Sequence, residues 1–338
     1  MPQEPIRVGI VGCGNAARTI HAPLLRKHAQ LYQLHACTDI VTDLAERFAA
    51  EHGPRFVPKL DDLLDDASVE LVVVTTRPPS THHDVAVAAL ARGKHVVVEK
   101  PMADDAEQCN RMIEAAQQGG RILTVHQNRR WDVDFLNAFD ALRLGKVGAP
   151  RLVRNEFNAG YRGSCYDWGI HIVDQTMCLS MDRRFIEITA TMARPNLSAP
   201  LAGEGFFSAR LLTEDGVAHD MSMLPAVDGN AFRPGTTVPR FVLVGTEGIM
   251  IQQWCQRPED AFGSSIRHQR AESDQEPFGD PPSVTAALSI PDFYERLHGA
   301  LRAGGPAPVC PRSARRSVTA WELVCKAASA GRTLSIEL

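Results

Sequence analysis

The sequence lacks the features that mark several large classes of protein. It has no excess of positive charge: 36 Lys and Arg residues face 40 Asp and Glu residues, for a formal net charge of -4. This balance gives no electrostatic case for binding nucleic acid or an anionic membrane. No apolar run approaches the roughly 20 residues of a transmembrane helix. There is also no internal repeat and no low-complexity tract, so the sequence argues against a membrane-spanning, nucleic-acid-binding or repeat protein.

The eight cysteines are not spaced like a metal or disulfide framework, because no CxxC pair occurs. Cys13, Cys37 and Cys325 lie in apolar contexts, and we interpret them as reduced core thiols. The pair His82 and His83 has no second cluster of ligands nearby in the sequence, so we expect no metal. The N-terminal residues run into a predicted strand without the layout of a signal peptide, and we therefore expect a cytoplasmic protein.

What is present is a chain of 338 residues with 44% apolar and 22% charged residues, which is ordinary for a globular protein of two domains. Residues 1–126 alternate short apolar strands with helices, which predicts an α/β domain with a doubly wound parallel sheet. The expected strands cover residues 6–11, 34–38, 70–76, 93–98 and 121–125. The helices between them are expected to follow residue 14 and to cover residues 41–52, 84–92 and 105–118.

The glycine turn, residues 12–17 (GCGNAA), lies between the first strand and the first helix. Gly12 permits a tight turn, Gly14 lets backbone approach a pyrophosphate, and Ala17 is small enough for close packing of helix on strand. The start of the helix offers unpaired N–H groups to phosphate. We therefore predict a dinucleotide site that includes Gly12, Gly14, Asn15 and Ala16.

Asp39 ends the second strand at the place where an acid can select the cofactor. An acid roughly 20–25 residues after a glycine turn can accept hydrogen bonds from the adenosine ribose and repel a 2′-phosphate. Ile40 follows it, rather than an arginine, so the sequence favours NAD over NADP. The alternative is that Asp39 is only the N-cap of the helix over residues 41–52.

Glu99, Lys100 and Pro101 follow a run of three valines. Ligands of open α/β sheets bind outside the carboxyl ends of the strands. The Lys100 ammonium can hydrogen-bond an oxygen that becomes negative during a reaction, and Pro101 fixes the backbone after it. The alternative is a surface lysine that ends a strand before a turn.

The loop over residues 75–82 (TTRPPSTH) ends another strand of the predicted sheet. It is expected on the cofactor side, with Thr75, Arg77 and Pro78 in contact with the dinucleotide. His82 either lines this loop or has a structural role at the start of the next helix.

Residues 127–338 change to longer strands with hairpin signals, which predicts an α+β domain with a large, mostly antiparallel sheet. Expected strands cover 151–158, 186–193, 206–213, 217–224, 241–245, 249–254 and 333–336, with hairpin turns at 214–216 and 246–248. Helices are expected at 289–303 and 313–330. We expect the last helix to pack back on the first domain. Residues 258–282 are polar and interrupted by Pro and Gly, so they are expected to form a mobile loop.

Asp167, His171 and Asp174 share one face of a helix that begins near Tyr166, because their spacing is i, i+4 and i+7. Such a face is costly to bury unless its groups are paired or working. A neutral imidazole can take the proton of a hydroxyl group, and a carboxylate can orient the imidazole. The alternative is that Asp167 is an N-cap and His171 has no special role.

Together these residues resemble the Gfo/Idh/MocA oxidoreductase family. The resemblance rests on the glycine turn, on His82 and residues 93–96, on Glu99-Lys100-Pro101, and on the pattern Asp167-x-Gly-x-His171-x-x-Asp174. It covers nearly the whole chain. Residues 128–135 further resemble the branch that contains scyllo-inositol dehydrogenases.

The resemblance implies a two-domain enzyme with the nicotinamide between the domains. Lys100, Asp167 and His171 match the catalytic positions, and Glu99 matches a position that meets the nicotinamide ribose. It also implies homodimers or homotetramers formed through the second sheet. The expected substrate-binding residues are Lys100, Arg130, Trp131, Tyr161, Arg162, Asp167 and His171.

Two departures from the family bear on specificity. NADP-using inositol relatives tend to carry Ser-Arg where this chain has Asp39-Ile40, which supports NAD. Residues 157–166 are short beside a substrate loop of that branch, so inositol specificity does not transfer directly. We expect an NAD(H)-dependent oxidoreductase of a cyclic polyol, sugar or sugar derivative. The alternative is a dinucleotide-binding regulator or sensor without turnover, which need not keep Lys100, Asp167 and His171.

Overall fold

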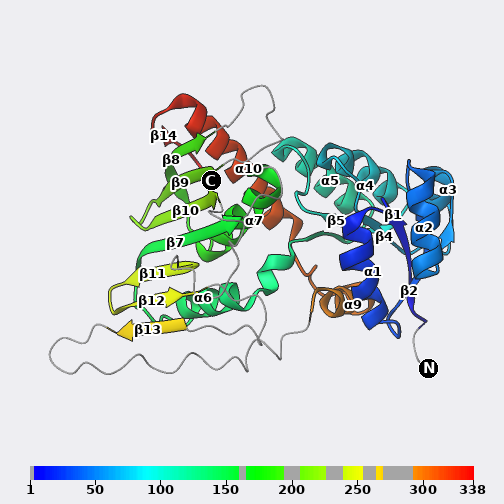
Figure 1. Cartoon of the computed structure of the whole chain (residues 1–338), viewed down its shortest axis with the longest axis horizontal. Coiled ribbons are helices and arrows are strands. Elements are labelled where there is room, and N and C mark those ends of the chain that lie inside the picture. Colours follow the sequence, from blue (N-terminus) through cyan, green and yellow to red (C-terminus); the bar gives the residue numbers. More distant parts are fainter. Residues whose placement is uncertain (1–3, 160–164, 194–205, 226–238, 254–263, 269–291) are drawn as a thin grey trace. The chain divides into compact units, whose positions relative to one another are not determined.

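The computed structural model describes residues 4–159, 165–193, 206–225, 239–253, 264–268 and 292–338. The chain divides into two compact units (Figure 1). Unit 1 contains Met1–Gln127 and Pro291–Val318, and unit 2 contains Asn128–Ile290 and Thr319–Leu338. The segment 291–318 therefore returns to unit 1 after the chain has passed through unit 2.

Unit 1 is built on a six-stranded sheet with the order β3-β2-β1-β4-β5-β6. All its strand pairs are parallel, which confirms the predicted doubly wound sheet. The order reverses between β1 and β4, and ligands of such sheets bind at this switch point. The strands are β1 (Ile6–Val11), β2 (Tyr32–Thr38), β3 (Arg55–Phe56), β4 (Leu71–Val74), β5 (His95–Glu99) and β6 (Leu123–His126).

Two helices of unit 1, α5 and α9, begin after an aspartate that caps them. Asp105 precedes α5 and accepts a hydrogen bond from the backbone N–H of Gln108. Asp292 and Glu295 form a reciprocal capping box at the start of α9. The helices are η1 (Ala17–His21), α1 (Ala22–Lys27), α2 (Thr42–His52), α3 (Leu60–Leu64), η2 (Pro79–Thr81), α4 (His82–Ala91), α5 (Ala106–Gln118) and α9 (Phe293–Ala303). α3 and β3 were not predicted from the sequence, because they are too short to show a period.

Unit 2 is built on an eight-stranded sheet with the order β13-β12-β11-β7-β10-β9-β8-β14. Only β7 and β10 pair in parallel among the described strands, so the sheet is mostly antiparallel, as predicted. The predicted turns join β9 to β10 and β11 to β12. The strands are β7 (Pro150–Ala159), β8 (Phe185–Ala193), β9 (Phe206–Thr213), β10 (Ala218–Pro225), β11 (Phe241–Gly245), β12 (Gly248–Gln252), β13 (Ser264–His268) and β14 (Leu334–Ser335).

The expectation of a loop over residues 258–282 is wrong at Ser264–His268. These residues form β13, which pairs antiparallel with β12 at the edge of the sheet. The segment reads Ser-Ser-Ile-Arg-His, and a polar edge strand lacks the apolar alternation by which a strand is recognised in a sequence. The rest of the expected loop lies outside the described residues.

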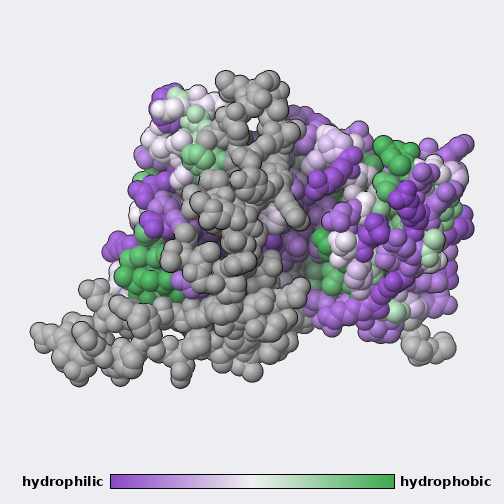
Figure 2. Space-filling view, in the orientation of Figure 1, coloured by the Kyte–Doolittle hydropathy of each residue, from purple (hydrophilic) through white to green (hydrophobic). Residues whose placement is uncertain are grey.

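The described helices of unit 2 pack on one face of the second sheet. The other face, called the open face here, carries partly exposed apolar side chains on β11 and β12. The helices of unit 2 are η3 (Asn128–Trp131), α6 (Val133–Arg143), α7 (Cys165–Leu179) and the later turns of α10 (Pro311–Ala330), which begins in unit 1. Phe135, Val153 and Phe241 belong to the core beneath the sheet. On the open face, Ile249 is 42% exposed, and Figure 2 shows hydrophobic residues gathered over β11 and β12. α6 was not predicted from the sequence. Within the described residues, no helix combines the length and the apolar character needed to cross a membrane.

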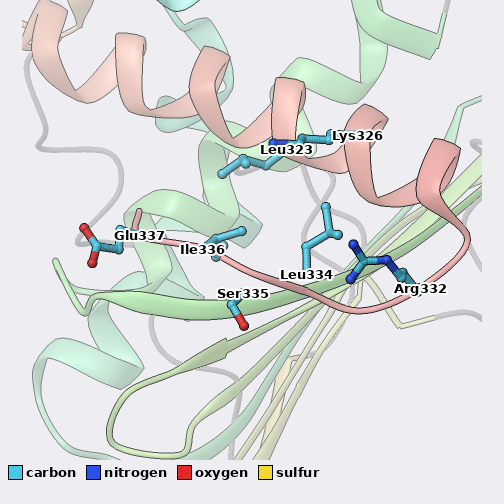
Figure 3. A pocket seen from close by; sticks show the side chains of 7 residues that line it. All are labelled: Leu323, Lys326, Arg332, Leu334, Ser335, Ile336 and Glu337. Atoms are coloured by element: carbon cyan, nitrogen blue, oxygen red, sulfur yellow. The ribbon is translucent and has the colours of Figure 1, made fainter.

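A pocket of about 530 Å³ lies between α10 and the segment that contains β14 (Figure 3). Its lining combines the apolar Leu323, Leu334 and Ile336 with the cations Lys326 and Arg332. None of the predicted site residues lines it, so the candidate active site lies elsewhere.

Candidate active site

The glycine turn after β1 is closed on one side and open on the other. Gly12 has φ +92°, and a Cβ there would lie 2.8 Å from backbone atoms of Thr75 and Thr76, so only glycine fits. A Cβ at Gly14 would meet nothing within 4 Å, so its backbone faces open space. Ala17 is fully buried behind the turn. This cradle fits the pyrophosphate of a dinucleotide.

Asp39 is tied to the same turn. Its carboxylate accepts hydrogen bonds from the backbone N–H of Cys13 at 2.7 Å and of Val41 at 2.8 Å. Val41, rather than Asp39, is the N-cap of α2. The side chain of Ile40 is 99% exposed next to it. An acid thus stands beside the glycine turn, where a ribose would follow a pyrophosphate.

The loop after β4 is fastened to its neighbours by two side chains. The Thr75 hydroxyl donates to the carbonyl oxygen of Gly12. The buried His82 ring faces the carbonyl oxygens of Thr76 at 3.0 Å and Pro101 at 2.8 Å. Burial lowers the pKa of His82, and a neutral imidazole has a single N–H, so the ring donates to one oxygen at a time. The remaining predicted cofactor residues on the loops after β1 and β4, all at least partly exposed, are Asn15, Ala16, Arg77 and Pro78.

Glu99 is the last residue of β5, and Lys100 begins the loop that follows it. The backbone N–H of Lys100 donates to Oε2 of Glu99 at 3.1 Å. Oε1 of Glu99 lies 2.9 Å from His21 and 2.7 Å from His126, so this predicted cofactor contact is buried among imidazoles. Because β1, β4 and β5 are neighbours, the glycine turn, the loop after β4 and Lys100 lie along one edge of the sheet.

In unit 2, α7 carries the predicted acid–imidazole–acid face. Asp167 lies half-buried in the first turn, His171 is 5% exposed and Asp174 is 1% exposed. The guanidinium of Arg130 donates two hydrogen bonds to Asp174, at 2.6 and 2.7 Å. Asp174 is therefore engaged with Arg130, and the pair Asp167 and His171 lies toward the start of the helix.

Aromatic rings pack around His171. Trp168 stacks on Phe157 with ring centres 5.5 Å apart, and its ring centre lies 6.0 Å from that of His171 in an edge-on arrangement. The guanidinium of Arg129 lies 5.1 Å from the rings of both Phe157 and Trp168. A Cβ at Gly169 would come within 2.7 Å of the Trp321 ring, which explains the glycine between the acid and the histidine.

The predicted site residues therefore form two groups. Unit 1 brings together the glycine turn, Asp39, Glu99 and Lys100, and unit 2 carries Asp167 and His171 on one helix. The expected substrate contacts in unit 2 are the half-buried Arg130 and Trp131 at the end of η3, and Tyr161 and Arg162, which lie outside the described residues.

Sequence reasoning missed the partners that reach these groups from distant segments. They include His21, His126 and Tyr294 around Glu99, and the buried Arg240 of unit 2. Arg240 hydrogen-bonds the side chains of Asn155 and Gln175, and burial lowers its pKa to about 10. The one local signal was the position of His21, four residues after Ala17 and therefore on the same inward face of the helix.

Comparison with known proteins agrees with this geometry. Residues 6–127 match the GFO_IDH_MocA family model, described as an oxidoreductase family with an NAD-binding Rossmann fold. Residues 6–127 therefore belong to the Gfo/Idh/MocA oxidoreductase family. The match covers the sheet, the glycine turn and Lys100, and it confirms the predicted oxidoreductase fold.

Three proteins show how far the likeness extends. The scyllo-inositol 2-dehydrogenase (NADP(+)) IolW of Bacillus subtilis is 26% identical over 99% of this chain and 97% of its own length. The uncharacterized oxidoreductase C115.03 of Schizosaccharomyces pombe is 30% identical over 60% of this chain and 59% of its own. The structure of the WlbA dehydrogenase of Bordetella pertussis, in complex with NADH and UDP-GlcNAcA, has a TM-score of 0.75 at 19% identity and covers 99% of each chain. The last of these shows the fold alone.

Proposed function

We propose that the chain is an NAD(H)-dependent oxidoreductase of a ring secondary alcohol or ketone in a cyclic polyol, sugar or sugar derivative. The observation that carries the proposal is Lys100 at the carboxyl end of β5, on the sheet edge of a glycine turn that fits a dinucleotide. His171 and Asp167 on α7 supply the proton chemistry. The full-length relative named as a scyllo-inositol 2-dehydrogenase supports a polyhydroxylated ring as the substrate class.

Each residue has a defined task in this scheme. A bound nicotinamide would supply the acceptor for the hydride that leaves the substrate carbon. A ring nitrogen of His171 takes the proton of the substrate hydroxyl, and the Asp167 carboxylate orients the ring and favours its cation. Nζ of Lys100 donates a hydrogen bond to the reacting oxygen, where negative charge develops. The same groups serve the reduction of a ring ketone in the opposite direction.

A substrate panel tests the proposal. The purified chain is mixed with NAD+ or NADP+ and a series of cyclic polyols, sugars and sugar derivatives, and NADH or NADPH absorbance is followed. Reduction of NAD+ with at least one ring alcohol is expected. If NADH binds, as measured by fluorescence, but no member of the panel is turned over in either direction, a regulator or sensor is the better assignment.

NAD is expected to be preferred over NADP, because Asp39 offers a carboxylate to ribose hydroxyls and would repel a 2′-phosphate. The double change Asp39→Ser with Ile40→Arg removes that charge and adds a cation beside the turn. We expect it to shift the ratio of NADPH to NADH affinity by at least about tenfold, or 1.4 kcal/mol. Fluorescence titration of both cofactors measures this ratio without knowledge of the substrate.

Ile40→Arg alone is the matched control for that change. It keeps the Asp39 carboxylate and its hydrogen bond to Cys13, so it separates the added cation from the lost acid. If the wild-type chain binds NADPH as tightly as NADH, Asp39 does not select the cofactor and the preference is overturned.

We also propose that the chain is cytoplasmic and forms a homodimer or homotetramer through the open face of the second sheet. The cysteines of the described residues are all free, as in a reducing compartment. Val242 faces Ile251, and Val244 faces Leu152 and Ile249, in neighbouring strands; all five residues are at least partly exposed, Ile249 the most. Large exposed apolar patches commonly mark protein interfaces.

Ile249→Lys is therefore expected to convert the assembly to monomers at micromolar concentration, because it places a charge in the centre of the apolar patch. Analytical ultracentrifugation measures the change. Leu144→Lys is the matched control, since Leu144 is 56% exposed but follows α6, outside the patch. A wild-type chain that sediments as a monomer, or equal effects of both variants, would remove the sheet face as the interface.

A further inference from the structure

Glu99 is the centre of a buried hydrogen-bond network within unit 1. Its Oε1 lies 2.9 Å from Nε2 of His21 and 2.7 Å from Nδ1 of His126. The other ring nitrogen of His21, Nδ1, lies 2.7 Å from the hydroxyl of Tyr294 in α9. His21 and Tyr294 are fully buried, and Glu99 and His126 are nearly so. The network joins η1, β5, β6 and α9 directly before Lys100.

The geometry fixes the direction of the hydrogen bonds. An ionised carboxylate only accepts, so Nε2 of His21 and Nδ1 of His126 both carry protons. Burial lowers the pKa of His21, which keeps the ring neutral and leaves Nδ1 as an acceptor. Burial also holds the pKa of Tyr294 well above its usual value, so its hydroxyl keeps the proton that it donates to His21. Tyr294 thereby selects the tautomer of His21 that donates to Glu99.

The two imidazoles decide the charge of Glu99. Burial alone would raise the pKa of this carboxyl, but the neighbouring His126 and His21 hold it well below its usual range. Without those donors, burial would dominate and the carboxyl would take up a proton.

The distances from Oε1 of Glu99 to the two imidazole nitrogens are those of hydrogen bonds rather than those between ligands of a metal ion. A tetrahedral zinc with bonds of about 2.0–2.1 Å would hold its ligand atoms about 3.3 Å apart. The two contacts of Glu99 at 2.9 and 2.7 Å are instead normal lengths for charge-assisted hydrogen bonds. The distances therefore describe a buried carboxylate whose Oε1 accepts hydrogen bonds from two imidazole N–H groups.

We propose that Tyr294, His21 and His126 are positioning residues that hold Glu99 as a fixed carboxylate beside Lys100, ready to accept a hydrogen bond from the bound cofactor. The proposal rests on the proposed function, because it concerns the cofactor edge of the same sheet. Oε1 uses both its lone pairs on the two rings, and Oε2 uses one on the backbone N–H of Lys100. One acceptor position on Oε2 is left for a cofactor hydroxyl.

Two other titratable groups of unit 1 lie near the Glu99 carboxylate. The charge of Glu99 acts to raise the pKa of His82 at the start of α4, and Lys100 is the next residue in the chain. The Tyr32 ring lies 5.4 Å from that of Tyr294, and its hydroxyl donates to the Tyr294 carbonyl oxygen, outside the path from Tyr294 to Glu99. Tyr32 and Tyr294 therefore form a matched pair for a test.

The first experiment removes one hydroxyl at a time, with Tyr294→Phe and Tyr32→Phe. Infrared difference spectra are recorded as the pH is lowered from about 8 to about 5, a range in which an ordinary glutamate, with a pKa near 4.3, stays mostly ionised. Burial raises the pKa of Asp132 to about 7, so its carboxylic acid C=O band should appear in every variant over this range. We expect one additional C=O band in Tyr294→Phe, which is absent from the wild type and from Tyr32→Phe. Combining Tyr294→Phe with Glu99→Gln should abolish the additional band and assign it to Glu99.

NADH affinity, followed by fluorescence over the same range, is the second readout. In Tyr294→Phe it should fall by up to about tenfold for each pH unit below the midpoint of the new band, while the wild type and Tyr32→Phe stay nearly flat. Equal behaviour of the two tyrosine variants would overturn the proposal. A wild-type chain that does not bind NADH at all would instead contradict the proposed function, which keeps the two failures distinct.

A second pair of variants keeps the test decisive if Tyr294→Phe does not fold. His126→Asn retains an N–H donor near the position of Nδ1, and His126→Leu removes it. His126→Leu should show the additional carboxylic acid band and the pH-dependent NADH affinity, and His126→Asn should restore the wild-type behaviour. If His126→Leu titrates like the wild type, the imidazoles do not control the charge of Glu99.

Discussion

Replacing Lys100 with Met is expected to lower kcat by on the order of 10²–10³ or more while NADH still binds. The change removes the ammonium group that would donate to the reacting oxygen, which carries its charge only during the reaction. The proposed contacts that hold the cofactor are mainly those of the glycine turn and Asp39. Parallel measurements of turnover and of NADH fluorescence separate the two effects.

Lys59→Met is the matched control, because Lys59 is an exposed lysine of unit 1 far along the chain from this edge. It should leave both turnover and NADH affinity unchanged. A Lys100→Met enzyme that keeps more than about a tenth of wild-type activity has lost less than 1.4 kcal/mol of transition-state stabilisation. Such a result would exclude the proposed role of Lys100 at the reacting oxygen.

The sequence predicts the first sheet well because its information is local. Buried parallel strands read as continuous apolar runs, and the glycine turn has a fixed place after the first of them. The second sheet also follows from local signals, since hairpin turns such as residues 214–216 mark where strands reverse. β13 breaks this rule because an edge strand with polar residues carries no such signal.

The partners of the site residues escape prediction because they come from distant segments. The pattern placed Asp174 with Asp167 and His171 on one helix face, but nothing in it revealed that Arg130, 44 residues away, would bind Asp174. Glu99 is a similar case: the hydroxyl that orients its neighbour His21 belongs to Tyr294, which lies 273 residues from His21. Sequence spacing identifies which groups can do chemistry, and the fold decides which of them are already engaged.

His171 and Asp167 are expected to act as a unit in proton transfer. His171→Ala and Asp167→Asn should each lower the rate of alcohol oxidation on the order of 10²–10⁴-fold, and the double change should cost much less than the product of the two. The reason is that a carboxylate that only orients an imidazole has nothing left to orient once the imidazole is gone. Steady-state rates of the four enzymes at one pH measure this coupling.

Two further measurements separate that unit from a structural role. Glu187→Gln is the matched acid-to-amide control, since Glu187 is exposed on β8 of the same unit; its cost should be near zero and should simply multiply with that of His171→Ala. Oxidation by the wild type should fall as the pH is lowered, because a protonated imidazole cannot accept the hydroxyl proton, whereas reduction needs that proton and should not fall in the same range. His171→Ala should lose this pH dependence.

Two outcomes would contradict the proposed unit. Strictly multiplicative losses of rate for His171 and Asp167 would mean that they act separately. Near-normal turnover by His171→Ala would assign the proton transfer to another group, with Lys100 and Tyr166 the next candidates.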